Sequence, residues 1–327
     1  MEQRSFERLG RSVGIVGLGA WQLGSEWGEI GEVQALALLE SALEAEIDFI
    51  DTADVYGDGR SERLIGKLLT AHPDTELMVA TKMGRRLDQV PENYVLDNFI
   101  SWTDRSRANL GLDTIDLVQL HCPPSLVYRS DEVFDSLDEL VALGRISAYG
   151  VSVETCAQAL IAIARPNVVS VQIILNALRL KPIEQVLGAA QKAGVGVIIR
   201  LPLASGLLAG KYDLNTTFPS DDHRAFNRNG EAFDIGETFA GVPFEIGLEA
   251  VRALAPTVPD ELTIAQFALR WVLDQEGVTV AIPGARDSSQ VISNAAAANA
   301  SELTRSQHEA VLEVYKSLIK PLVHERW

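Results

Sequence analysis

The chain has 327 residues, of which 47% are hydrophobic and 22% are charged, so it can build a large apolar core and does not have the composition of a disordered protein. Its 28 basic and 45 acidic residues give a formal net charge of −17, which repels nucleic-acid backbones and anionic lipid surfaces. We therefore expect a globular protein that binds a small molecule, with neither nucleic acid nor membrane as a partner.

The first ten residues, MEQRSFERLG, are charged throughout and lack the apolar core of a signal peptide. The most apolar run, residues 195–210, is interrupted by Arg200 and Pro202, which argues against a membrane span. Cys122 and Cys156 form neither a disulfide framework nor a metal motif. These features predict a cytoplasmic protein, and we expect no metal site.

Short β-rich runs alternate along the chain with amphipathic segments whose apolar residues are spaced by three and four. The eight predicted strands lie at residues 13–20, 48–54, 76–82, 116–121, 147–153, 168–176, 195–201 and 279–285. The predicted helices lie at residues 33–45, 61–69, 97–110, 131–143, 183–193 and 264–273. The predicted strands and helices therefore alternate along the chain.

Several of these strands are continuous apolar runs, which is typical of parallel strands covered on both faces. Eight such units predict an α/β fold of the (β/α)8 TIM barrel type, forming a single domain over residues 1–327. The alternative is an open doubly wound sheet, which usually carries a glycine-rich nucleotide loop after its first strand. Gly17 and Gly19 are present there, but Gln22 stands where the third glycine should be, so the barrel is favoured.

Two segments depart from even spacing. Residues 5–10 and 12–17 predict a small N-terminal β-hairpin that caps one barrel mouth. Residues 210–239 form a long polar loop after the seventh strand, and loops of this length are usually functional or disordered.

Polar residues at the ends of barrel strands carry the most information, because the active site of such barrels lies at the C-terminal mouth. Asp51 ends the second strand and leads to Tyr56, while Lys82 ends the third strand and His121 the fourth. Taken singly, Asp51 could be a turn residue, Tyr56 a packed aromatic and His121 a core histidine. Lys82 differs, because a lysine after an apolar run must reach solvent or find a carboxylate.

Together, these four residues predict an acid catalyst. An adjacent ammonium favours the ionised form of a phenol, so Lys82 would make Tyr56 a better acid. Asp51 would hold the lysine, and His121 would orient or polarise a carbonyl oxygen. Such a site protonates an oxygen as negative charge develops on it, and hydride addition to a carbonyl develops that charge.

The sequence resembles the aldo-keto reductases over essentially its whole length. The motifs are GLGAWQLG, DFIDTADVYGDGRSERLIG, VATKMG, DLVQLHCP, YGVSVE, VQIILN, PLASGLLAGKY and IPGARDSSQVISN. The resemblance implies a (β/α)8 barrel that reduces aldehydes or ketones with NADPH. It places the family's catalytic tetrad on Asp51, Tyr56, Lys82 and His121, with Tyr56 as the general acid for reduction.

The resemblance also implies cofactor and substrate contacts. Ser152 and Gln172 match residues that hold the nicotinamide carboxamide, and Arg200 stands where many members stack a tyrosine on the ring. Its guanidinium could lie against a ring or pair with phosphate. Trp21 matches a wall of the substrate pocket, together with Tyr56 and His121, and the loop that folds over the pyrophosphate is matched by Leu203, Ser205 and Lys211.

The last strand departs from the family pattern. Gly284, Ala285, Gln290 and Ser293 replace a lysine, a serine or threonine, an arginine and a glutamate, and Asn294 is retained. Arg286 could replace the lost cations by a bidentate contact with the 2′-phosphate. We expect NADPH, with NADH as the alternative cofactor. The Gly-Ala-Arg variant looks closest to the bacterial and potassium-channel β-subunit branches.

Two other functions stay open at this point. Lys82 could form an imine with a carbonyl substrate, as in Schiff-base aldolases. The chain could instead be a regulatory, channel-β-subunit-like protein that binds NADPH with little turnover. The pocket walls come from loops, so the sequence leaves the substrate, the physiological direction and the oligomeric state open.

Overall fold

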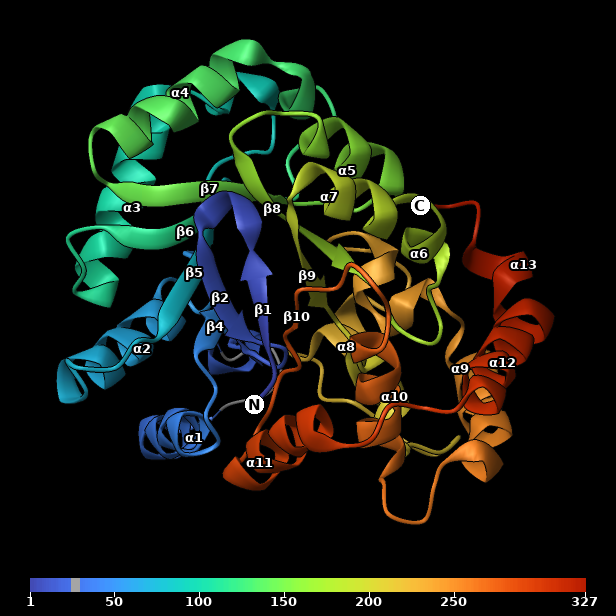
Figure 1. Cartoon of the computed structure of the whole chain (residues 1–327). Helices are drawn as coiled ribbons and strands as arrows, with labels where there is room; N and C mark the ends of the chain where they lie inside the picture. Colours follow the sequence, from blue (N-terminus) through green and yellow to red (C-terminus); the bar gives the residue numbers. More distant parts are fainter. Residues whose placement is uncertain (25–29) are drawn as a thin grey trace.

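The computed structural model describes residues 1–24 and 30–327. Within these residues, eight parallel strands form one sheet in which each strand pairs with the next along the chain (Figure 1). The strands are β3 (Leu18–Gly19), β4 (Phe49–Asp51), β5 (Met78–Met83), β6 (Ile115–His121), β7 (Ile146–Ser152), β8 (Val168–Ile174), β9 (Gly196–Arg200) and β10 (Val280–Ala281). Every predicted strand run overlaps one of them.

The sheet closes on itself between its first and last segments. Parallel bridges join Val16 to Ala281 and Gly19 to Gly284, and the Gly17 amide donates to the Ala281 carbonyl over 2.9 Å. A side chain at Gly19 would place a Cβ 2.8 Å from the Ile282 carbonyl oxygen, so glycine permits the close approach of the two segments. The predicted (β/α)8 barrel is confirmed.

The N-terminal hairpin is also confirmed, with a shifted register. β1 (Gln3–Phe6) pairs antiparallel with β2 (Arg11–Gly14), rather than residues 5–10 with 12–17. The intervening Glu7–Leu9 form a 3-10 turn that ends at Gly10 with a left-handed φ of 67°, so they cannot extend the strand. Phe6 stacks on Phe49 at 6.0 Å and packs among residues at the starts of the barrel strands, so the hairpin closes the N-terminal mouth.

Helices surround the barrel (Figure 1). The predicted segments correspond to α1 (Glu32–Glu44), α2 (Arg60–Ala71), α3 (Leu96–Leu110), α4 (Asp131–Ala142), the pair α6 (Lys181–Gln185) and α7 (Leu187–Ala193), and α10 (Ile264–Leu273). The alanine-rich residues 293–300 predict a helix end, which corresponds to the end of α11 (Ser288–Ala296). The helices that were not predicted are α5 (Cys156–Ile163), α8 (His223–Phe226), α9 (Phe244–Leu254), α12 (Arg305–Val314) and α13 (Lys320–Val323). None of the helices in the described ranges has the length and apolar character needed to cross a membrane.

The long segment after β9 is packed although it contains little regular structure. Phe239 and Phe244 contact each other at 5.0 Å, and Phe218 packs on Phe239 at 5.8 Å. Phe218, Arg224 and Glu237 from this segment line the main cavity of the barrel. The segment therefore supplies part of the site at the C-terminal mouth.

Candidate active site

Strand register places three of the predicted polar residues at one level of the barrel, with Arg200 two residues beyond that level. His121 on β6 pairs with Ser152 on β7, and Ser152 pairs with Gln172 on β8. Arg200 ends the next strand, β9, where it pairs with Ile174. All four side chains line the same cavity.

Lys82 is buried and held by three acceptors. Its Nζ donates to Asp51 Oδ1 over 2.5 Å, to the Thr52 carbonyl over 2.8 Å and to the Tyr56 hydroxyl over 3.4 Å. Burial lowers the pKa of Lys82, and the charge and hydrogen bond of Asp51 oppose that shift. The Lys82 ammonium is therefore held between the Asp51 carboxylate, the Thr52 carbonyl and the Tyr56 hydroxyl.

Tyr56 lies between the lysine and the cavity. Its ring stacks on Trp21 with centroids 6.1 Å apart and meets His121 edge to face at 5.9 Å. Tyr56, His121 and Trp21 line the cavity, whereas Lys82 is not among the described residues that do. The arrangement joins a half-buried phenol that lines the cavity to a buried cation behind it.

His121 is held as the neutral imidazole. Burial lowers its pKa well below the ordinary value, and the charges of Arg85, Lys82 and Arg200 lower it further. Its Nδ1 is buried without a hydrogen-bond partner in the described part of the chain. A neutral imidazole at this position can donate or accept a hydrogen bond but does not add a second cation.

The cavity has a volume of about 650 Å³, within the range of small-molecule sites. It runs from the ends of the strands past Arg200 to the start of α11. Every residue predicted for catalysis, cofactor or substrate, apart from Lys82, lines it: Trp21, Asp51, Tyr56, His121, Ser152, Gln172, Arg200, Leu203, Ser205, Lys211, Gly284, Arg286, Gln290 and Asn294. The fold therefore brings these residues, which are far apart in the sequence, together around one cavity.

Gln119 is a site residue that the sequence analysis missed. Its Nε2 donates to Asp51 Oδ2 over 2.9 Å, and Gln172 Nε2 donates to the same oxygen over 2.8 Å. Gln119 lies two residues before His121 on β6, so both side chains project to the same face of the strand. That spacing is the signal that could have identified it.

A charged cluster beside His121 was also missed. Arg85 and Arg200 both lie against Glu237 Oε1, at 3.4 Å and 3.5 Å, and Arg85 lies 3.6 Å from Glu154. Arg200 Nη2 also donates to the Val153 carbonyl over 3.2 Å. Glu237 comes from the irregular segment after β9, which carries no periodic signal that would place it here.

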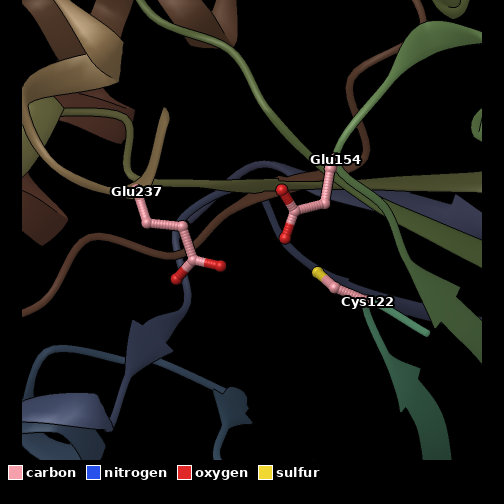
Figure 2. A group of neighbouring side chains, drawn as sticks. All are labelled: Cys122, Glu154 and Glu237. Carbon is pink, nitrogen blue, oxygen red and sulfur yellow. The ribbon is translucent and has the colours of Figure 1, made fainter. Parts of the chain in front are cut away.

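Cys122, Glu154 and Glu237 turn their side chains toward one another, with ligand atoms within 4.8 Å (Figure 2). Three such residues resemble a metal-binding set. Here, however, the guanidinium groups of Arg85 and Arg200 pair with the carboxylates. Burial by itself would lower the pKa of Arg85, but Glu237 raises it above the ordinary value. We therefore interpret this cluster as an arginine–glutamate network.

At the far end of the cavity, hydrogen bonds hold the backbone of Arg286 while its side chain is exposed. The Arg286 amide donates to Gln290 Oε1 over 3.0 Å, and the Arg286 carbonyl accepts from Gln34 Nε2 over 2.9 Å. The exposed Arg286 guanidinium has no hydrogen bond or ion pair within residues 1–24 and 30–327. By contrast, the Ser205 hydroxyl is used within the fold, since it donates to the Glu237 carbonyl over 3.0 Å and accepts from the Phe239 amide over 3.2 Å.

The cavity is suited to a dinucleotide. Its lining extends from the strand ends to the start of α11. It contains the buried polar side chains of Ser152 and Gln172. The buried Arg200 Nε has no hydrogen-bond partner among the described residues. Arg286 and Lys211 supply cationic groups near its other end. These donors match the amide and phosphate groups of a nicotinamide nucleotide.

The fold and this site define the class of barrel oxidoreductases. Residues 15–316 match the model of the Aldo/keto reductase family. The uncharacterized oxidoreductase Rv2298 of Mycobacterium tuberculosis is 33% identical over 318 residues, which cover 93% of this chain and 90% of the relative. The chain belongs to the aldo/keto reductase family, as the resemblance implied.

Solved structures give the same result for the fold. The glycerol dehydrogenase AKR11B4 from Gluconobacter oxydans superposes with a TM-score of 0.79 at 28% identity, covering 99% of this chain and 98% of that one. An aldo-keto reductase from Klebsiella pneumoniae, solved in complex with NADPH, has a TM-score of 0.71 at 20% identity and covers 96% and 95% of the two chains. These relatives are bacterial, and the likeness to potassium-channel β-subunits stays a prediction.

Proposed function

We propose that this chain reduces an aldehyde or ketone to the alcohol with NADPH, using Tyr56 as the general acid. The observation that carries the proposal is the contact between Lys82 Nζ and the Tyr56 hydroxyl, with Asp51 holding the lysine from behind. A phenol that faces the cavity and is backed by a buried ammonium can release a proton to a substrate oxygen.

When bound, the nicotinamide supplies a hydride to the carbonyl carbon. The proton on the oxygen comes from the Tyr56 hydroxyl, and the Lys82 ammonium stabilises the phenolate that remains. The neutral imidazole of His121 orients the carbonyl oxygen beside the phenol. Asp51, which also accepts from Gln119 and Gln172, fixes the lysine against the barrel wall.

The cofactor contacts are proposed along the cavity in order. Ser152 and Gln172 hold the carboxamide end, and the chain at Leu203, Ser205 and Lys211 runs along the phosphates. Gly284, Arg286, Gln290 and Asn294 hold the adenosine end, with Arg286 on the 2′-phosphate. The NADPH bound to the Klebsiella pneumoniae structure supports the choice of cofactor, and NADH is the alternative.

The Schiff-base alternative is disfavoured by the position of Lys82. The three acceptors around its Nζ use all three donors of an ammonium. An imine would require a free amine that reaches the substrate, whereas Tyr56 separates this nitrogen from the cavity.

A carbonyl panel followed by nicotinamide absorbance, with NADPH and NADH in parallel, tests the proposal. The panel includes glyceraldehyde and other hydroxylated aldehydes, because the structural relative from Gluconobacter oxydans is a glycerol dehydrogenase. We expect carbonyl-dependent oxidation of NADPH. Tight NADPH binding without turnover on any carbonyl would instead support the regulatory alternative.

A further inference from the structure

The arginine–glutamate network borders the chemical end of the cavity. Arg200 and Glu237 line the cavity together with Tyr56 and His121. The charge of Arg200 lowers the pKa values of both Lys82 and His121, although burial is the larger cause in each case. Arg200 is therefore electrostatically coupled to the groups that would act on a carbonyl.

A hydride donor must lie beside these groups. The carbon that accepts the hydride is one bond from the oxygen that Tyr56 protonates, so the reactive ring has to lie within a few ångströms of the phenol. Arg200 ends β9 on the same rim, and its guanidinium is fixed by Glu237 and the Val153 carbonyl. A ring held at the Tyr56 end of the cavity would therefore lie close to a fixed positive charge.

The network carries more positive than negative charge at neutral pH. Burial and the nearby charge of Glu237 raise the pKa of Glu154, which favours the neutral form of this carboxyl. Burial raises the pKa of the Cys122 thiol, which is likewise neutral. Two guanidinium groups, those of Arg85 and Arg200, then face the single carboxylate of Glu237. Of the neighbouring charges, Lys82 pairs with Asp51. The pKa of Arg179 is lowered by burial and by the charge of Arg200, and the charge of Asp234 opposes that shift.

This excess charge distinguishes the two oxidation states of a nicotinamide. The oxidised ring is a pyridinium cation and the reduced ring is neutral, while the adenosine and phosphate groups are the same in both. A nearby guanidinium repels only the oxidised ring. Glu237 offsets part of that repulsion.

We propose that Arg200 and Glu237 set the preference of this protein for reduced over oxidised cofactor, with Arg200 disfavouring NADP⁺ and Glu237 limiting the effect. The inference rests on the proposed function, since it requires the nicotinamide to occupy this cavity. It assigns Glu237, on the segment after β9, a positioning and electrostatic role in cofactor choice. The protein would preferentially hold the form that can donate hydride and release the oxidised product.

The ratio of two dissociation constants, Kd for NADP⁺ over Kd for NADPH, tests this directly. Both nucleotides are titrated at pH 7 by tryptophan fluorescence or calorimetry, without substrate. Contacts to the phosphates and adenosine affect both constants alike and cancel in the ratio. We expect Arg200→Gln to lower the ratio about tenfold and Glu237→Gln to raise it about tenfold, as for a unit charge a few ångströms away in a partly screened site.

Two controls separate charge from structural damage. Arg200→Lys keeps the charge and should hold the ratio within about threefold of the wild type. Glu245→Gln removes an exposed glutamate on α9 and should leave the ratio unchanged. If Glu237→Gln fails to fold, the comparison of Arg200→Gln with Arg200→Lys still tests the charge.

The outcomes are distinct. Opposite shifts for Arg200→Gln and Glu237→Gln support the inference. Unshifted ratios, shifts in the same direction, or a lysine variant that behaves like the glutamine variant would overturn it. If the wild-type protein bound neither NADPH nor NADP⁺, the proposed function would fail together with the inference, whereas normal binding with unshifted ratios would overturn the inference alone.

Discussion

The Nζ of Lys82 lies 3.4 Å from the hydroxyl oxygen of Tyr56, although the two residues are 26 positions apart and only the tyrosine faces the cavity. The parallel pairing of β4 with β5 produces this contact, because Asp51 and Lys82 then project from adjacent strand ends. A buried cation is thereby placed behind a phenol that a substrate can reach.

Replacing the lysine should impair proton transfer. Lys82→Met removes the cation that stabilises the phenolate, so we expect turnover to fall by about two to four orders of magnitude. NADPH affinity should change little, because Lys82 does not line the cavity among the described residues. In the direction of alcohol oxidation, the pH optimum should move upward, and steady-state rates across pH measure it.

A second variant controls for folding. Lys82→Met alone leaves the Asp51 carboxylate buried without its partner, which is expected to destabilise the fold by about 3–5 kcal/mol. Asp51→Asn combined with Lys82→Met removes both charges and should recover stability but not turnover. Recovery of turnover in the double variant would show that the cation is not required.

Arg286 should determine the choice between NADPH and NADH. Its exposed guanidinium lines the far end of the cavity, while its backbone is fixed by Gln34 and Gln290. Arg286→Ala should weaken NADPH binding about tenfold or more, as for the loss of a charge-assisted contact to phosphate, and should leave NADH binding nearly unchanged. Parallel titrations check this. An equal loss for both nucleotides would mean that Arg286 does not contact the 2′-phosphate.

Asp54 predicts a pH dependence of stability. Its side chain is fully buried, and neither carboxyl oxygen has a hydrogen-bond partner in the described ranges. Burial and the nearby Glu62 raise its pKa to about 7 from an ordinary value of 3.8. The unfolded chain therefore releases this proton at lower pH than the folded chain, so Asp54 makes stability fall as pH rises from about 4 through 7, by at most about 1.4 kcal/mol per pH unit.

Asp54→Asn should remove this dependence. The stability advantage of the variant over the wild type, measured as the difference in free energy of unfolding by urea denaturation, should be larger at pH 8.5 than at pH 5. Asp58→Asn is the control, since Asp58 is exposed and paired with Arg86 and Arg105, which lower its pKa. Its effect should be the same at both pH values. Parallel pH profiles for the wild type and Asp54→Asn would contradict the prediction.

The barrel was predictable because parallel strands covered on both faces must be apolar along their length. The apolar runs around Ile50, Val118 and Val171 therefore marked buried strands directly. The hairpin register was not predictable in detail, because Gly10 takes a left-handed conformation that turns residues 7–9 out of the strand. The first barrel strand is only Leu18–Gly19, since isolated bridges to Ala281 and Gly284 replace a regular ladder there.

The site was predictable where it depends on strand ends and was missed where it depends on packing between distant segments. Tyr56, Lys82 and His121 follow from the position of each strand. Glu237 does not, because it lies 152 residues from Arg85 in an irregular segment whose path is fixed by packing of Phe239 and Phe244. No local pattern encodes such a contact.

The most direct test of Tyr56 as the general acid is the rate of NADPH oxidation by Tyr56→Phe with a carbonyl that the wild type reduces, together with NADPH affinity. Phenylalanine keeps the ring that stacks on Trp21 and removes only the hydroxyl that contacts Lys82. We expect NADPH binding within a few-fold of the wild type and a loss of turnover of at least about two orders of magnitude. Wild-type turnover in this variant would contradict the assignment of Tyr56 as the acid.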